Sequence, residues 1–136
     1  MRIVNENPFF LKKLHQHALY PNLKRTIFTF GDTIYNPGGF KIHYFLLDHE
    51  KVHQKQQEDF VGGAEAWWDK YLEDKKFRLS QEIPAYKAQY KSICKNVKDR
   101  NKRNEILIDI ARSLSSSTYG NIITISEAIK ELKYGM

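Results

Sequence analysis

The sequence predicts an α+β fold that is mostly helical, with one small β-sheet near the N-terminus. Two observations favour this class. Two short β-rich runs flank Gly31-Asp32, and most of the chain after residue 42 has apolar residues at helical spacing. The 136 residues are 41% hydrophobic and 13% aromatic, which suits one packed core, so we expect a single domain over residues 1–136.

The N-terminal part is expected to hold a short helix followed by a β-hairpin. Asn7 and Pro8 are suited to the N-cap and the first position of that helix. The hairpin is predicted over Thr26–Tyr35, because Gly31-Asp32 favours a two-residue turn. The Asn-Pro-Gly-Gly run at residues 36–39 then breaks the chain.

Five helical segments are expected after the hairpin. Their predicted ranges are residues 42–60, 64–72, 81–98 and 104–115, followed by a last helix that begins near residue 124. Ser80 or Gln81 is the expected cap of the third segment, which places Pro84 in a first turn, where proline is tolerated. Thr124 and Glu127 have the spacing of a capping box at the start of the last helix.

The motif with the clearest chemistry is His-Glu-Lys-Val-His at residues 49–53. On a helix this spacing places His49 and His53 on one face, where they can ligate one zinc ion. Glu50 lies about 100° around the helix from His49 and can reach a water molecule on that ion. The same face carries apolar side chains, and buried imidazoles and a carboxylate need a shared partner. We therefore expect zinc rather than two separately hydrogen-bonded core histidines.

A catalytic zinc site normally has three protein ligands, and two carboxylates are candidates for the third. Asp59 stands where the pattern HExxHxxGxxH has its last ligand, but that pattern needs glycine where this chain has Gln56. Glu82 lies on a core-facing stripe of a later helix, and a buried carboxylate needs a strong partner, so it is favoured. The alternative is a partly exposed Glu82 in a first helical turn. Tyr86 projects the same way and could either hydrogen-bond to a developing oxyanion or pack.

The runs HEKVHQKQ, WWDKYL and FRLSQEIPAYKAQY resemble small HExxH proteins of phages and bacteria, which are minimal gluzincin-like metallopeptidases. In those proteins a glutamate on a later helix completes the zinc site. The resemblance extends over residues 26–132, and relatives often carry a second acidic residue where this chain has Pro84. It implies a zincin-like fold, with the hairpin at residues 26–35 beside the HExxH helix and its edge strand bordering a substrate cleft.

The same resemblance implies the roles of individual residues. His49, His53 and Glu82 correspond to the zinc ligands, and Glu50 corresponds to the general base. The expected reaction is attack on a peptide carbonyl by a zinc-activated water, with a peptide or protein as substrate. Two alternatives stay open. One is a zinc-stabilised scaffold without turnover, and the other is a basic module that binds nucleic acid.

Composition limits the remaining classes of function. Cys94 is the single cysteine, which excludes an internal disulfide and cysteine-rich zinc modules. The net charge of +6 permits acidic partners, and the densest basic run is residues 95–103. No apolar run approaches the roughly 18 residues of a membrane helix, and the start lacks a signal-peptide pattern. We therefore expect a cytoplasmic protein with no membrane partner.

Overall fold

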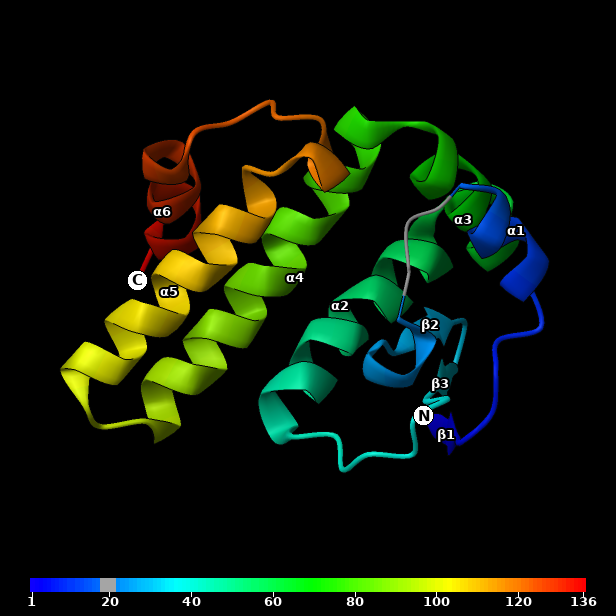
Figure 1. Cartoon of the computed structure of the whole chain (residues 1–136), viewed down its shortest axis with the longest axis horizontal. Helices are drawn as coiled ribbons and strands as arrows, with labels where there is room; N and C mark the ends of the chain where they lie inside the picture. Colours follow the sequence, from blue (N-terminus) through cyan, green and yellow to red (C-terminus); the bar gives the residue numbers. More distant parts are fainter. Residues whose placement is uncertain (18–21) are drawn as a thin grey trace.

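The computed structural model describes residues 1–17 and 22–136, and these residues form six α-helices and a three-stranded sheet (Figure 1). The strands are β1 (Arg2–Val4), β2 (Phe28–Phe30) and β3 (Thr33–Tyr35). The helices are α1 (Leu11–Gln16), α2 (Tyr44–Asp59), α3 (Gly63–Glu73), α4 (Lys75–Asn96), α5 (Arg100–Leu114) and α6 (Ile125–Lys133), and the short 3-10 helices are η1 (Leu23–Arg25) and η2 (Ser117–Tyr119). The predicted α+β class with mostly helical content is confirmed.

The sheet has the order β1-β3-β2. β2 and β3 form the predicted antiparallel hairpin, and Gly31 in its turn has a φ of +61°, a conformation that glycine adopts without strain. β1 adds to the hairpin in parallel, with Ile3 opposite Ile34. The sequence did not predict β1, because three residues are too short for an alternating pattern to be visible.

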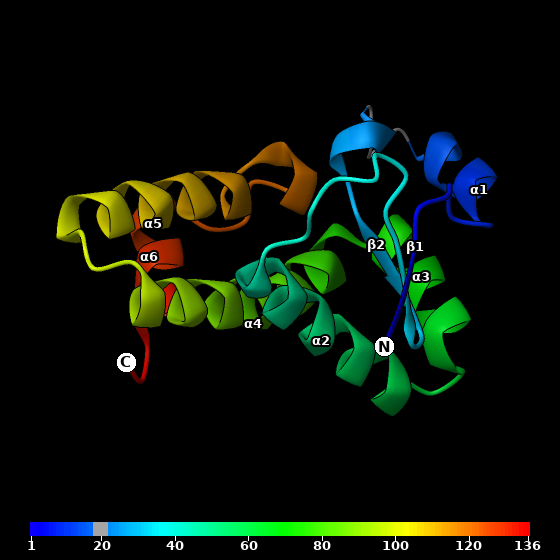
Figure 2. The same cartoon turned by 90° about the horizontal axis from the view of Figure 1, so that it is seen from below.

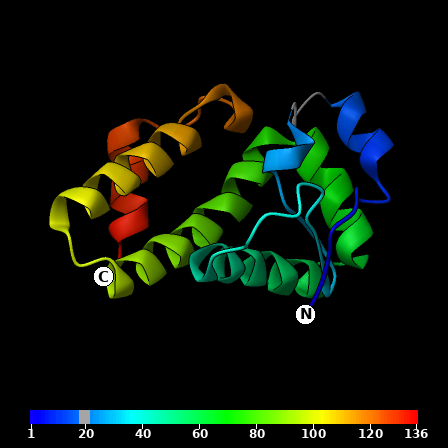
Figure 3. The same cartoon turned by 60° about the horizontal axis from the view of Figure 1, so that its bottom comes forward.

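Helices α2 and α4 pack along each other through the middle of the molecule, as Figures 1 and 3 show. The sheet, α1 and α3 lie toward one end, and α5 and α6 lie toward the other (Figure 2). Each end has its own buried apolar cluster. One combines residues of α1, β2 and α3, and the other combines residues of α4, α5, η2 and α6. The α2–α4 contact therefore joins two small cores.

The start of α1 differs from the prediction. Phe10, not Asn7, is at the N-cap position, and it makes no side-chain cap. Pro8 is fully buried, and its carbonyl accepts a hydrogen bond from the amide of Leu11 at 3.1 Å. Pro8 thus forms a turn before the helix rather than its first residue, and the predicted Asn-Pro cap is wrong.

The start of α4 also differs from the prediction, and this difference changes the position of Glu82 within its helix. Asp74 caps α4 by accepting a hydrogen bond from the amide of Phe77 at 3.0 Å, so the predicted cap at Ser80 or Gln81 is wrong. Pro84 consequently lies inside the helix on an exposed side, where it cannot donate to the carbonyl four residues earlier. Glu82 is therefore a buried residue of the helix interior rather than a first-turn residue.

The predicted ranges of α2, α3 and α6 are close to the observed ones, whereas α5 has a different start. The break at residues 36–39 precedes α2 as expected. Thr124 and Glu127 form both hydrogen bonds of the capping box of α6. α5 begins four residues earlier than predicted, because the Asp99 carboxylate accepts from two amides of its first turn. Among the described helices, none has both the length and the apolarity needed to cross a membrane.

A buried arginine ties α3, α4 and η2 together. Arg78 of α4 is 2% exposed, and its guanidinium donates hydrogen bonds to the carbonyls of Tyr71, Leu72 and Thr118. Two of these carbonyls belong to the C-terminal turn of α3, where the helix dipole favours a positive charge. Arg78 thus holds the end of α3 against α4.

Arg78→Met is expected to destabilise the fold. Each of its carbonyl acceptors would lose a buried donor, and an unsatisfied buried group costs about 1–3 kcal/mol. We expect urea unfolding to show a loss of stability of at least about 2 kcal/mol. Arg112→Met is the matched control, because Arg112 is exposed and pairs with Asp109 at 3.7 Å. Equal stability of the two variants would contradict a structural role for Arg78.

Candidate metal centre

The HExxH motif lies in the middle of α2, and its functional side chains are buried against α4. His49, Glu50 and His53 are 7%, 5% and 5% exposed, and Glu82 of α4 is 6% exposed. His49 and His53 are four residues apart on α2, so the helical period of 3.6 residues directs both of them toward α4, and the sequence predicts their common direction. The packing of α2 on α4 therefore brings Glu82 to three titratable side chains of α2, the nearest of which in sequence is 29 residues away.

Three of these side chains converge on one point. The Nε2 atoms of His49 and His53 lie 3.2 Å apart, and Glu82 Oε1 lies 3.1 Å from the first and 2.9 Å from the second. Three ligand atoms of a tetrahedral zinc site with bonds of about 2.05 Å are separated by about 3.3 Å. The observed triangle is close to this size, and its donor set of two imidazoles and one carboxylate suits zinc.

Both carboxylates near the histidines have to be considered as ligands. His49, Glu50 and His53 each offer one atom, and these atoms all lie within 4.8 Å of one another. Glu50 Oε2 is 3.7 Å from His49 Nε2, whereas Glu82 Oε1 contacts both histidines at hydrogen-bond distance. Glu82 is therefore better placed as the third ligand, and Glu50 is left beside the triangle.

Gln56 determines which ring nitrogen of His53 carries a proton. Its amide nitrogen donates to the carbonyl of Gln81 at 2.9 Å, so its Oε1 faces His53 Nδ1 at 2.8 Å and accepts from it. His53 Nδ1 thus carries a proton, and its Nε2 is the atom directed at Glu82 and His49. Among the described residues, the buried Nδ1 of His49 has no such partner.

The electrostatics of the triangle favour a positive charge at its centre. Burial alone lowers the pKa of His53, but the Glu82 carboxylate offsets this and raises that pKa to about 9. Burial alone would raise the pKa of Glu82, but the charge of His53 and hydrogen bonds from both histidines hold it well below its usual value. A proton on His53 supplies the positive charge in the metal-free chain, and a divalent cation would displace it.

Strand β2 contacts the site through Thr29. The Thr29 hydroxyl donates to Glu50 Oε1 at 2.9 Å, which fixes one oxygen of the expected base and leaves Oε2 toward the histidines. The Thr29 carbonyl accepts from Gln57 Nε2 and Trp68 Nε1, both at 2.8 Å. β2 thus borders the site as expected, but its Thr29 carbonyl already has two donors, which disfavours pairing of a substrate strand at this residue.

Tyr86 lies beside the triangle of His49, His53 and Glu82 without directing its hydroxyl at it. Its ring contacts the ring of His49 edge to face, with centroids 4.6 Å apart. Its hydroxyl lies near Ser113 and Tyr119, and burial together with the Glu82 charge raises its pKa to about 12. The oxyanion-binding role expected of Tyr86 stays a prediction that this orientation does not favour.

The other expected ligand lies away from the histidines. Asp59 ends α2, its side chain is 61% exposed, and it pairs with Lys55 at 3.2 Å. The structure therefore brings Glu82, and not Asp59, to His49 and His53.

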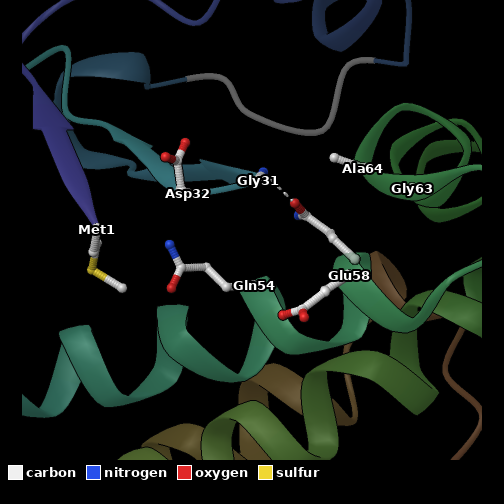
Figure 4. A pocket seen from close by; sticks show the side chains of 8 residues that line it. Met1, Gly31, Asp32, Gln54, Glu58, Gly63 and Ala64 are labelled. Atoms are coloured by element: carbon white, nitrogen blue, oxygen red, sulfur yellow. Dashed lines mark hydrogen bonds between the residues drawn. The ribbon is translucent and has the colours of Figure 1, made fainter.

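The space around His49, His53 and Glu82 is small. Thr29, Trp67, Trp68 and Tyr71 enclose, with the four titratable residues, a cavity of about 50 Å³, which has room for water molecules. A wider cavity of about 400 Å³ opens between the hairpin turn and the C-terminal half of α2 (Figure 4). Asp32, Gln54 and Glu58 line this second space, but neither His49 nor His53 does.

The basic run at residues 95–103 lies at the connection between α4 and α5. Two of its basic side chains interact with neighbouring groups of the protein. Arg103 donates to the carbonyls of Val97 and Lys98 at 2.8 and 2.9 Å, and Lys102 lies 4.0 Å from Glu105. Nucleic-acid binding by this run stays a prediction.

Three residues make hydrogen bonds to the site that the sequence did not predict. Thr29 holds Glu50, Gln56 holds His53, and the hydroxyl of Tyr71 donates to Glu82 Oε2. Gln56 could have been found, because it lies one turn from His53 on the same helix. Thr29 and Tyr71 come from other elements, and only the tertiary packing brings them to Glu50 and Glu82.

Comparisons of the chain with protein-family models, with curated proteins and with solved structures found no match. The functional interpretation therefore depends on the geometry of the four buried residues and on the motifs that they form.

Proposed function

We propose that this chain is a zinc-dependent hydrolase of the metallopeptidase type. The observation that carries the proposal is the triangle of His49 Nε2, His53 Nε2 and Glu82 Oε1 with a further carboxylate, Glu50, beside it. A purely structural zinc site needs ligands only. An additional buried carboxylate that is held in place next to three ligands has the arrangement of a general base.

The chain's own residues supply the binding and the proton transfer. His49, His53 and Glu82 would hold the ion, whose Lewis acidity lowers the pKa of water to about 7 and polarises a carbonyl. Glu50 lines the small cavity and its Oε2 lies 3.7 Å from His49 Nε2, so it could accept a proton from a water molecule there and deliver it to a leaving amine. Thr29 keeps Glu50 oriented during both transfers by donating to Oε1.

A second candidate is a metal site that only stabilises the fold. The observation that favours it is the tight enclosure of the site, since a cavity of about 50 Å³ does not hold a peptide. The ion would then join α2 to α4, and through them the two apolar clusters. Both candidates require the same ligands, so they differ only in turnover.

Metal removal tests the proposal. We expect the purified chain to bind about one zinc ion, measured by plasma emission spectroscopy. Zinc at 1,000 times its dissociation constant stabilises a fold by about 4 kcal/mol, which raises the melting temperature by on the order of 10 °C. Hydrolysis of an unfolded protein such as casein should stop when a chelator removes the ion and return when zinc is added.

The outcomes separate the two candidates. Zinc-dependent stability together with zinc-dependent cleavage supports the hydrolase. Zinc-dependent stability without cleavage of unfolded proteins or peptide libraries supports the scaffold. A chain that binds no zinc after reconstitution would contradict both.

A further inference from the structure

Tyr71 contacts the proposed third ligand through the carboxylate oxygen that the histidines do not use. Glu82 Oε1 faces His49 and His53, whereas Glu82 Oε2 accepts a hydrogen bond from the Tyr71 hydroxyl. Both side chains are buried, with exposures of 3% for Tyr71 and 6% for Glu82. The two oxygens of one carboxylate therefore have different partners on different elements.

The position of Tyr71 is fixed on several sides. Its ring stacks on Trp67, with centroids 4.8 Å apart, and the Arg78 guanidinium lies 5.5 Å from the ring centre. Arg78 Nε also donates to the Tyr71 carbonyl at 2.8 Å. Because α3 and α4 hold both ends of this residue, its hydroxyl is presented to Glu82 in one place before any ion binds.

We propose that Tyr71 is a positioning residue that restricts Glu82 to one metal-binding oxygen. A carboxylate without a donor on its second oxygen can bind an ion through both atoms. Such two-atom binding would occupy the coordination position that a catalytic site keeps open for water. The hydrogen bond from Tyr71 occupies Oε2 and so leaves that position available. This inference rests on the proposed function, because it assumes that Glu82 is a ligand.

Cobalt substitution of the Tyr71→Phe variant tests this inference. Co²⁺ takes the place of zinc in His and carboxylate sites, and its visible absorption weakens as the coordination number rises. We expect the bands of cobalt-loaded Tyr71→Phe to lose intensity severalfold relative to the wild type. Competition with a chelator should also show an affinity loss of about 10- to 100-fold, as is typical when an outer hydrogen-bond partner of a ligand is removed.

Tyr90→Phe is the matched control. Tyr90 is also a buried tyrosine, 6% exposed, and its hydroxyl lies near Cys94 rather than near His49, His53 or Glu82. Its variant should lose stability to a similar degree and keep the wild-type cobalt spectrum. A purely structural role of Tyr71 would lower the melting temperature without changing that spectrum.

Two results would overturn the inference, and only one of them would also overturn the proposed function. If the wild type binds one Co²⁺ and Tyr71→Phe has the same spectrum and affinity, the role of Tyr71 is wrong and the proposed function stands. If the wild type binds neither Co²⁺ nor Zn²⁺, the inference and the proposed function are both wrong.

Discussion

Glu82→Gln is expected to lower the affinity for zinc by at least about 100-fold, because it replaces a direct ligand, and the loss of an outer partner alone costs about 10- to 100-fold. Glutamine has nearly the same shape, but its neutral amide is a much weaker zinc ligand than a carboxylate. The variant also removes the negative charge that raises the pKa of His53. Chelator competition should measure the loss of affinity, and the stabilisation by added zinc should disappear in thermal unfolding.

Asp59→Asn provides the control for this prediction. Asp59 is on the same helix as the histidines and is the other ligand that the sequence suggests, but its exposed side chain pairs with Lys55. Its variant should bind zinc with wild-type affinity, and its stability should change by less than about 0.5 kcal/mol. Wild-type affinity in Glu82→Gln, or a large loss in Asp59→Asn, would show that the ligand set is different.

The parts of this fold that the sequence predicted are those determined by local spacing. The i, i+4 separation of His49 and His53 fixes their common direction on any helix. The turn at Gly31-Asp32 and the capping box at Thr124 likewise depend on residues within four positions of one another. The inward direction of Glu82 followed from its apolar stripe, which does not depend on where the helix begins.

The boundaries of α4 show where local reasoning fails. Pro84 favoured a helix beginning a few residues before it, because proline is tolerated in a first turn. The structure instead begins α4 directly after α3, with Asp74 as the cap, and accepts Pro84 in the interior. Packing of α4 along α2 and the hydrogen bonds of Arg78 offset a helix defect that local propensity alone would avoid.

The residues that orient the site show a second limit of prediction from local sequence spacing. Tyr71 is 11 residues from Glu82, and Thr29 is 21 residues from Glu50, so neither contact has a signature in sequence spacing. An aromatic residue on the apolar face of a short helix predicts packing, and Tyr71 does pack against Trp67. Its hydroxyl gains a role only because α3 and α4 fold back on each other at Asp74.

Glu50→Gln is expected to lower the turnover rate by about 100- to 10,000-fold, the usual contribution of a general base. The glutamine oxygen can still accept the hydrogen bond from Thr29, whereas the amide nitrogen that replaces Oε2 cannot take a proton. The side chain should therefore stay in place and lose only its proton-transfer function. Zinc content and melting temperature should be those of the wild type, and hydrolysis of casein should be lost.

Glu58→Gln is the matched control for Glu50→Gln, because Glu58 is an exposed glutamate of the same helix and does not line the ligand cavity. Three results are distinct. Loss of cleavage with retained zinc supports a base at Glu50. Loss of zinc in Glu50→Gln instead makes Glu50 a ligand, which its place among the atoms within 4.8 Å of one another allows. Cleavage at the wild-type rate by a zinc-loaded Glu50→Gln variant would exclude the proposed mechanism. Among the described residues, the only other carboxylate that lines the cavity is Glu82, which the ion would engage.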